Sequence, residues 1–63
     1  MSDQVRIELK GNRFAVVLEH GGSTQEMDVR DTYPDAEAFA LYVARRVKLD
    51  VYYLGQHIQG RKG

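Results

Sequence analysis

The sequence predicts a small α+β domain in which a three-stranded antiparallel meander carries one helix on one of its faces. Two glycine-containing turns, Gly11-Asn12 and Gly21-Gly22, separate three segments in which apolar and polar residues alternate. The next segment has apolar residues at three- and four-residue spacing, which is the period of an amphipathic helix. These signals agree on a β-β-β-α order, to which residues 49–54 add a C-terminal strand.

The two turns also predict how the strands pair. The turn at Gly11-Asn12 places three apolar pairs opposite one another across residues 4–10 and 13–20: Leu9 with Phe14, Ile7 with Val16, and Val5 with Leu18. The turn at Gly21-Gly22 adds residues 23–30 and two more apolar residues on that side: Met27 opposite Val16, and Val29 opposite Phe14. Because side chains alternate along a strand, this register gives one buried face and one face open to solvent (the open face).

A helix is expected after the third strand. Thr32 is a suitable N-cap, Pro34 is tolerated in the first turn, and Asp35 can complete a capping box. The apolar stripe expected to pack on the sheet comprises Ala36, Phe39, Ala40, Val43 and Val47. Leu41 and Tyr42 lie off this stripe, so we expect some apolar surface to remain exposed there. Beside Tyr33 this pair could seed a dimer or partner contact, although single exposed apolar residues are also normal.

Residues 49–54 are rich in residues that favour extended backbone. A strand that follows a helix crossing the sheet would most simply run parallel to the first strand, at the edge of the sheet, in the spatial order 4-1-2-3. The chain is thus predicted to be one domain, residues 1–63, with residues 56–63 as a flexible tail.

The length of the chain limits its stability. A chain of 63 residues buries only about 60% of its unfolded surface. With no cysteine and two histidines, it offers neither a disulfide nor a thiolate metal site, so we predict no metal and no cofactor. A partner chain is the remaining source of buried area, and a homodimer is therefore expected. No signal segment or membrane-length apolar run is evident, which favours a cytoplasmic protein.

Charge and motifs narrow the functional classes. Nine basic and nine acidic residues cancel, although a dedicated nucleic-acid binder usually has net positive charge. Residues 19–37 hold six acids and one base, whereas residues 45–63 hold five bases and one acid. No catalytic motif is present, and Ser23 and His20 beside the second turn fit a cross-strand polar pair. We predict that the chain is not an enzyme.

The open face supplies the main candidate residues. The expected register groups them in three rows across the strands: Lys10, Arg13 and Arg30; Glu8, Ala15 and Asp28; and Arg6, Val17 and Glu26. Three bases in one row suggest either anion binding or compensation by neighbouring acids. Ala15 and Val17 form a small apolar centre ringed by charge, which suits a protein contact and equally suits an ordinary central strand.

The C-terminal third supplies further candidates. Tyr52 and Tyr53 point to opposite faces, so one is expected in the core and the other on the open face or at the sheet edge, where it could anchor a protein contact. Bases that could bind an anion or nucleic acid follow or end the helix: Arg45, Arg46, Lys48, Arg61 and Lys62.

The predicted order of elements resembles two groups of small proteins. One is the arm-type DNA-binding domains of phage-type integrases, which lay a sheet face into the major groove. Here that face would carry Glu8, Glu19, Glu26 and Asp28, whose charge repels phosphate. The other is the small phage inhibitors of host RNA polymerase. No sequence motif links the chain to either group, and no family is assigned.

These observations favour a non-enzymatic protein-interaction module, a regulator or inhibitor of bacterial or phage type that binds a larger protein. The expected contact residues are Arg6, Ala15, Val17, Glu26, Tyr52 and Tyr53. The alternative is a nucleic-acid-binding accessory domain that uses the basic C-terminal region.

Overall fold

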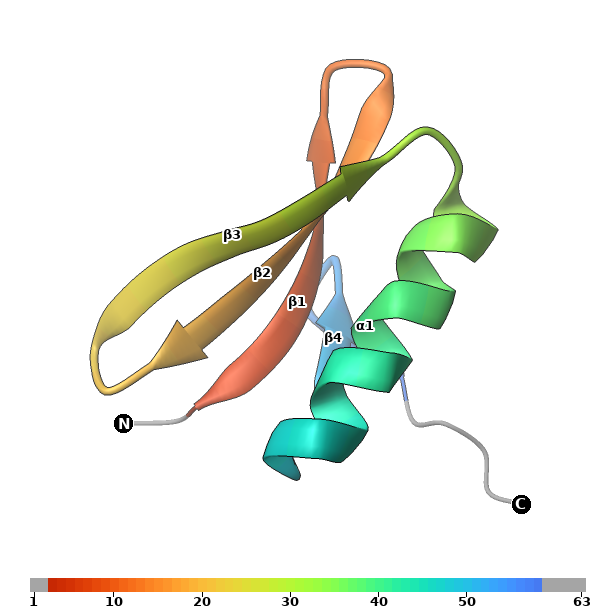
Figure 1. Cartoon of the computed structure of the whole chain (residues 1–63). Helices are drawn as coiled ribbons and strands as arrows, with labels where there is room; N and C mark the ends of the chain where they lie inside the picture. The colour runs from red at the N-terminus through yellow and green to blue at the C-terminus, as the bar shows by residue number, and fades with distance from the viewer. Residues whose placement is uncertain (1–2, 59–63) are drawn as a thin grey trace.

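The computed structural model describes residues 3–58, which form a five-stranded mixed sheet with one helix packed on one face (Figure 1). The elements in chain order are β1 (Gln4–Lys10), β2 (Arg13–His20), β3 (Ser23–Arg30), α1 (Tyr33–Val47), β4 (Val51–Tyr53) and β5 (Gln56–Ile58). The strand order is β3-β2-β1-β4-β5, with β4 parallel to β1 and the other neighbours antiparallel. The predicted meander, the packed helix and the parallel placement of the fourth strand beside the first are confirmed.

The C-terminal end of the sheet differs from the prediction. Residues 56–58, expected in a flexible tail, form β5, so β4 is not the edge strand. A two-residue turn at Leu54-Gly55 joins β4 to β5, and both of its residues have positive φ. The sequence signal for this hairpin is weak, because the first residue of its turn is leucine in place of the asparagine or glycine that such turns favour. The remainder of the predicted tail, residues 59–63, lies outside the described residues.

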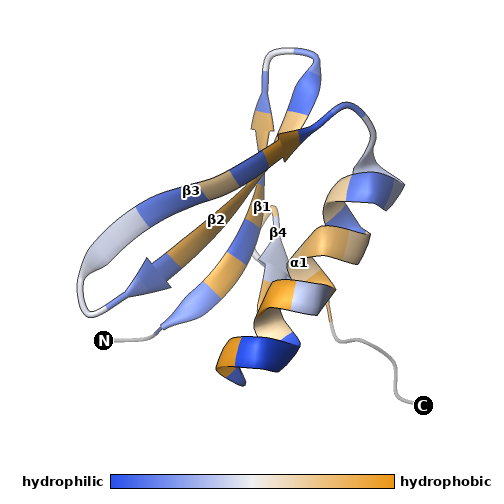
Figure 2. Ribbon diagram, in the orientation of Figure 1, coloured by the Kyte–Doolittle hydropathy of each residue, from blue (hydrophilic) through white to orange (hydrophobic). Residues whose placement is uncertain are grey.

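The pairing of β1 with β2 follows the predicted register from Gln4 opposite Glu19 to Lys10 opposite Arg13. Gly11 has a φ of 62°, a conformation that glycine adopts without steric cost. The turn chemistry and the apolar pattern therefore specify the same alignment, and Figure 2 shows the resulting alternation of apolar and polar residues along β1.

The predicted pairing of β2 with β3 is confirmed from the turn as far as Val17 opposite Glu26, and it is wrong beyond that pair. A β-bulge lies between the partners of Val16 and Val17, so Met27 has no partner and Val16 pairs with Asp28. Beyond the bulge, Phe14 pairs with Arg30, and every later β3 side chain has moved to the other face from the one predicted. Bulges are common on edge strands, where they interrupt the hydrogen bonds between the two strands. A side chain can then bond to a backbone group that the partner strand leaves free. Here the Asp28 carboxylate accepts hydrogen bonds from the backbone N–H of Val29 (2.8 Å) and from Nε of Arg30 (2.7 Å).

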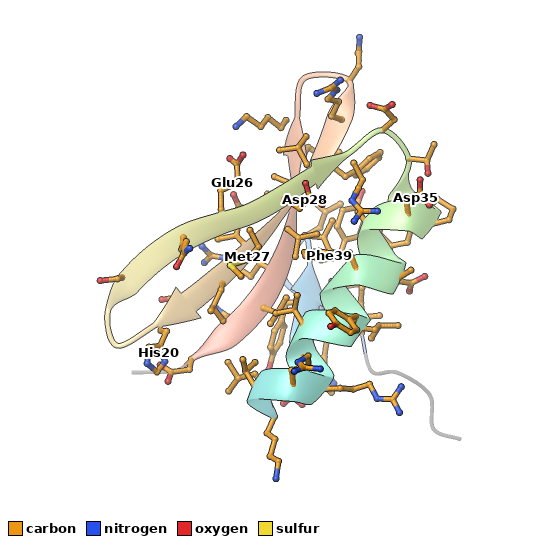
Figure 3. All side chains as sticks on the ribbon, in the orientation of Figure 1. His20, Glu26, Met27, Asp28, Asp35 and Phe39 are labelled. Atoms are coloured by element: carbon orange, nitrogen blue, oxygen red, sulfur yellow. The ribbon has the colours of Figure 1, made fainter. Side chains whose placement is uncertain are left out.

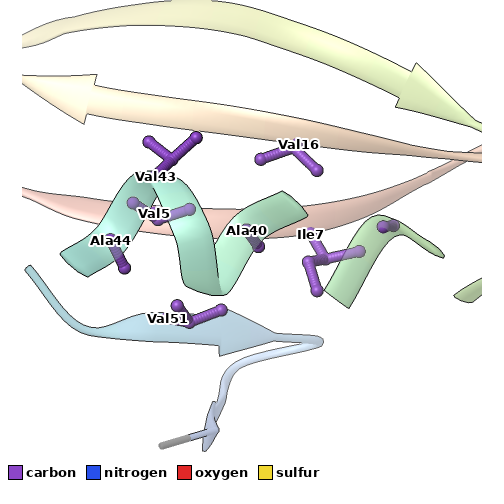
Figure 4. Close-up of a cluster of buried hydrophobic side chains, with 8 residues drawn as sticks. Val5, Ile7, Val16, Ala40, Val43, Ala44 and Val51 are labelled. Atoms are coloured by element: carbon purple, nitrogen blue, oxygen red, sulfur yellow. The ribbon is translucent and has the colours of Figure 1, made fainter. Parts of the chain in front are cut away.

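The core lies between α1 and the middle of the sheet (Figure 4). The helix contributes small residues, so its axis can approach the sheet closely, while branched residues of the strands fill the volume. The buried cluster comprises Val5, Ile7, Val16 and Val51 from the strands, and Ala36, Ala40, Val43 and Ala44 from the helix.

Three residues expected in the core are only partly covered or exposed. Leu9 is 58% exposed, because it lies near the end of β1 beyond the last pair that β1 forms with β4. Val47 at the end of α1 and Met27 at the bulge are also exposed. The helix covers the centre of the sheet, and the apolar residues at the ends of its stripe and of β1 project past it.

Both ends of α1 are capped. The Thr32 side chain accepts a 3.4 Å hydrogen bond from the backbone N–H of Asp35, as predicted. At the other end, Lys48 adopts a left-handed conformation (φ 61°, ψ 47°) and its N–H bonds to the carbonyl of Ala44, as does that of Leu49 (3.0 Å). Glycine is the residue that usually occupies this position.

Replacing Lys48 with glycine is expected to raise the free energy of unfolding by roughly 0.5–1 kcal/mol, because relief of left-handed strain exceeds the added entropy of the unfolded chain. Urea denaturation monitored by circular dichroism measures the change. Lys48→Ala is the control, since alanine removes the same charge but keeps a Cβ atom and should give no gain. Equal stabilisation by both variants would show that the charge, and not the backbone conformation, is responsible.

Candidate functional site

The open face of the sheet carries no helix among the described residues (Figure 1). One row of side chains crosses all five strands on this face. Arg6 pairs with Val17 and, on its other side, with Tyr52; Val17 pairs with Glu26, and Tyr52 with His57. Figure 3 shows Glu26 pointing away from α1. The predicted row of Arg6, Val17 and Glu26 is therefore confirmed.

The apolar centre of the open face exists, but it is not exposed. Ala15 and Val17 are 3% and 4% exposed, although no helix or strand among residues 3–58 packs over them. Long charged side chains on the neighbouring strands cover them, as the aliphatic stems of Arg and Lys often do. The expectation that Ala15 and Val17 offer themselves directly to a partner is wrong, because these stems occupy the space above them.

Ion pairs hold this cover in place. Arg6 contacts Glu8 (Nε to Oε2, 3.3 Å) and Glu19 (Nη1 to Oε1, 3.1 Å), and Lys10 reaches across β2 to Glu26 (Nζ to Oε1, 2.7 Å). The Arg6 Nε atom is buried and makes no hydrogen bond with good geometry. The bases of the open face are therefore balanced by carboxylates of the same face.

The predicted row of three bases does not form. Lys10 pairs with Arg13, but the bulge moves Arg30 to the helix side, where its guanidinium lies 4.9 Å from the centre of the Phe39 ring. The row Glu8, Ala15 and Asp28 changes in the same way, since Val29 takes the place of Asp28.

Each base of the predicted row instead has its own acid. Arg13 lies 3.0 Å from Asp31, and Arg30 lies 2.7 Å from Asp28. The pKa of the Asp28 carboxyl is lowered, chiefly by the hydrogen bond from Arg30 and next by that from the Val29 N–H. This pair is complete above the ordinary pKa of the carboxyl and is lost as the pH falls through the lowered pKa. The arrangement favours compensation over anion binding.

The two tyrosines of β4 are separated as predicted. Tyr53 points to the helix side and joins Phe14 and Tyr33, with ring centres 6.4 and 4.7 Å away. Tyr52 is on the open face, half-buried, with the His57 ring 5.2 Å from its own. His57 also lies 3.5 Å from Asp50. Tyr52 is thus the tyrosine that a partner on the open face can reach, whereas Tyr53 belongs to the core.

A second surface lies on the outward side of α1, opposite the residues that it buries. Its side chains surround a shallow hollow of ≈ 360 Å³: Ala38, Leu41, Tyr42, Arg45 and Arg46. Tyr42 is 56% exposed, and the Arg46 guanidinium lies 5.6 Å from the centre of its ring. We name this surface the helix face. The sequence pointed to Leu41 and Tyr42 as off-stripe residues and to the arginines as anion ligands, but not to one surface that they share.

The bases of the helix face differ from those of the sheet. Among residues 3–58, Arg6, Lys10, Arg13 and Arg30 each lie within 4 Å of a carboxylate. No such pair is formed by the bases at the end of α1, Arg45, Arg46 and Lys48, within that range. Arg61 and Lys62, which were grouped with these bases, lie outside the described residues.

Other chemistry has little support in the part of the chain that the structure describes. His20 and Ser23 are cross-strand neighbours, but the His20 ring contacts Asp3 (3.0 Å), whose other oxygen accepts from the Gly21 N–H. Between Asp3 and Ile58 no three His, Asp or Glu side chains are grouped as metal ligands would be. Over the same range, no helix has the length and apolar character needed to span a bilayer.

The fold and these surfaces define a small α+β domain in which residues 3–58 leave one sheet face without a covering helix, and in which the outer side of α1 carries both apolar and basic residues. Comparison with protein-family models, with curated proteins and with solved structures gave no match.

Proposed function

We propose that this chain is a non-enzymatic protein-binding module whose open face contacts a larger protein. The observation that carries the proposal is the position of Arg6 beside Tyr52 at the centre of an uncovered sheet face. Arg and Tyr are the residue types that most often anchor protein interfaces, and charged side chains of both signs surround them here. Such a centre and rim suit a protein surface of mixed charge.

The charge of the open face favours protein over nucleic acid as its partner. Glu8, Glu19 and Glu26 lie on this face, and each is paired with a base of the same face. A phosphate backbone would meet carboxylates and bases that are already balanced, so few counterions would be released on binding. A protein partner can instead exchange these ion pairs for its own. We propose on this basis that the chain acts as a regulator or inhibitor, in bacteria or phage, by occupying a surface of its target.

Tyr52 provides the test. In affinity capture from a bacterial lysate, Tyr52→Ala is expected to reduce recovery of the bound protein about tenfold or more, as loss of an interface anchor does. Tyr52→Phe keeps the ring and should retain most of the binding. Tyr42→Ala, on the helix face, is the matched control and should leave the same protein bound. Unchanged capture by Tyr52→Ala would contradict the proposal that the open face is the binding surface.

Val17→Asp is a poor probe of the same surface. Val17 lies beneath the Arg6 side chain and the Lys10–Glu26 pair, so a carboxylate there costs roughly 1–3 kcal/mol of stability. Loss of binding by this variant would report unfolding as readily as loss of a contact.

Nucleic-acid binding is a second candidate, and one observation favours it: Arg45, Arg46 and Lys48 have no acidic partner among the described residues. A gel-shift titration with duplex and single-stranded DNA and RNA should then show retardation at low salt that decreases steeply as salt is added. Arg46→Glu should weaken the shift, and Arg13→Glu, on the sheet, is the control. No retardation at low salt removes this candidate.

A further inference from the structure

We infer that the helix face binds a second copy of this chain, so that two α1 helices pack antiparallel across a twofold axis at Leu41. The inference concerns a surface on the other side of the molecule from the open face, and it does not depend on the function proposed above. Three features of α1 support it: an apolar centre, a symmetric arrangement of charges, and the absence of any partner for those charges within the described chain.

The apolar centre has the form of a helix-packing site. Ala38, Leu41, Tyr42 and Arg45 recur at three- and four-residue spacing. Ala38, Tyr42 and Arg45 are exposed, whereas Leu41 lies at the border of this surface, partly buried against the core. Ala38 is small, so a second helix can approach closely there. Side chains of one helix pack into such hollows between the side chains of another. Leu41 or Tyr42 of the partner subunit can fill the hollow, and the exposed Tyr42 would become buried.

The charges along α1 are symmetric about Leu41. Glu37 lies four residues before Leu41 and Arg45 four residues after it, while Asp35 lies six before and Arg46 five after. At about 1.5 Å of rise per residue, each acid is as far from Leu41 as one base, to within about 1.5 Å. A second helix that runs in the opposite direction and is centred on Leu41 therefore brings each acid level with a base.

The acid and the base of each pair also lie on the same flank of the helix. At 3.6 residues per turn, Glu37 and Arg45 lie on one side of the line through Ala38, and Asp35 and Arg46 lie on the other. In an antiparallel pair with a twofold axis, each flank adjoins the same flank of the other copy. Glu37 thus meets Arg45 of the partner subunit, and Asp35 meets Arg46 of the partner subunit. Symmetry forms each pair twice, so a single sequence supplies four ion pairs.

The charges concerned form no ion pair within the described part of the chain. Asp35, Arg45 and Arg46 have no oppositely charged group within 4 Å among residues 3–58. The Glu37 carboxylate accepts only a 3.5 Å hydrogen bond from the Tyr33 hydroxyl. Antiparallel packing also sets the two helix dipoles in opposite directions, which is their favourable arrangement.

A dimer of this kind fits the size of the domain and leaves its other surface free. The core consists of eight buried residues, so added apolar burial would contribute a large share of the stability. Because α1 covers one side of the sheet and the open face is the other, a dimer joined through α1 presents two open faces that point away from each other (Figure 1). The module would then be bivalent.

Sedimentation velocity over about 1 to 500 µM, the range in which a small interface associates, tests the inference. The wild-type chain should shift from monomer to dimer as concentration rises, and added salt should weaken the dimer. Glu37→Lys and Arg45→Glu should each weaken self-association about tenfold, since each replaces two attractive pairs by two repulsive ones. An equimolar mixture of the two variants should associate within about threefold of the wild type, because both pairs become attractive in the heterodimer.

Controls separate this result from its alternatives. Circular dichroism confirms that each variant is folded. Arg13→Glu on the sheet should dimerise normally, whereas Tyr42→Glu, at the exposed apolar residue of the helix face, should abolish the dimer. A wild-type chain that stays monomeric at the highest concentration overturns the inference. Dimers that both single variants retain place the interface elsewhere and overturn it as well. The same holds if the mixture remains monomeric while Glu37→Lys binds DNA or RNA more tightly, which would assign the helix face to nucleic acid.

Discussion

Replacing Ile7 with alanine is expected to leave the domain largely unfolded at 37 °C. Ile7 is 1% exposed, pairs with Val16 on one side and Tyr53 on the other, and is among the largest fully buried side chains. Truncation of such a residue costs about 2–5 kcal/mol, through lost burial and the cavity left behind. A core of this size supplies roughly 3–5 kcal/mol in total, so the loss is comparable with the whole stability.

Leu9→Ala is the matched control for this change. Leu9 is on the same strand and the same side of the sheet, two residues further along, yet it is largely exposed. Its truncation should cost no more than about 0.5 kcal/mol, as is usual for a surface position. Urea denaturation followed by circular dichroism gives both values. A similar cost for the two variants would mean that Leu9 is buried in solution, either in the monomer or by a partner.

The second large effect is expected from Ala40→Leu. Ala40 is fully buried on α1, in the same core cluster as Val5, Ile7 and Val16 of the sheet. Three added carbons have no space there, so the helix must move outward or the side chain must take a strained rotamer. Overpacking of this kind costs about 1–3 kcal/mol, and more where two elements are forced apart.

Ala38→Leu is the control for Ala40→Leu. It makes the same substitution two residues away on the exposed side of α1, where the added carbons meet no core atoms. Measured at low micromolar concentration, where self-association is slight, Ala38→Leu should leave the free energy of unfolding within about 0.5 kcal/mol of the wild type. If Ala40→Leu is tolerated equally well, the packing of α1 on the sheet is looser than the structure indicates.

The candidate surfaces were foreseen in part. The row of Arg6, Val17 and Glu26 and the division of Tyr52 from Tyr53 follow from alternation along strands, a property of local sequence. The burial of Val17 was missed, because it depends on where the ends of long side chains from other strands come to rest. The helix face was foreseen only in part, because Leu41 and Tyr42 were expected to seed a dimer or partner contact, whereas Arg45 and Arg46 were expected to bind an anion.

The contrast between the two hairpins of the meander shows where sequence reasoning stops. In β1–β2, turn, alternation and apolar pairs all specify one register, and that register is observed. In β2–β3, the turn at Gly21-Gly22 is correct, and the pairing holds as far as Glu26. Beyond Glu26, the Asp28 carboxylate accepts a hydrogen bond from the backbone N–H of Val29, and the Arg30 guanidinium stacks on the Phe39 ring of α1. That contact depends on how α1 packs against the sheet, which the alternation along residues 23–30 does not show.

The sequence by itself determined the class of fold, the order of the first five elements, the first two turns and the N-cap of the helix, because these depend on the conformational preferences of neighbouring residues. The tertiary structure alone decided which charges pair, which apolar residues project past the helix, and that β5 is the edge strand of the sheet. Those outcomes depend on distances between residues that are remote in sequence, and only the packed chain fixes such distances.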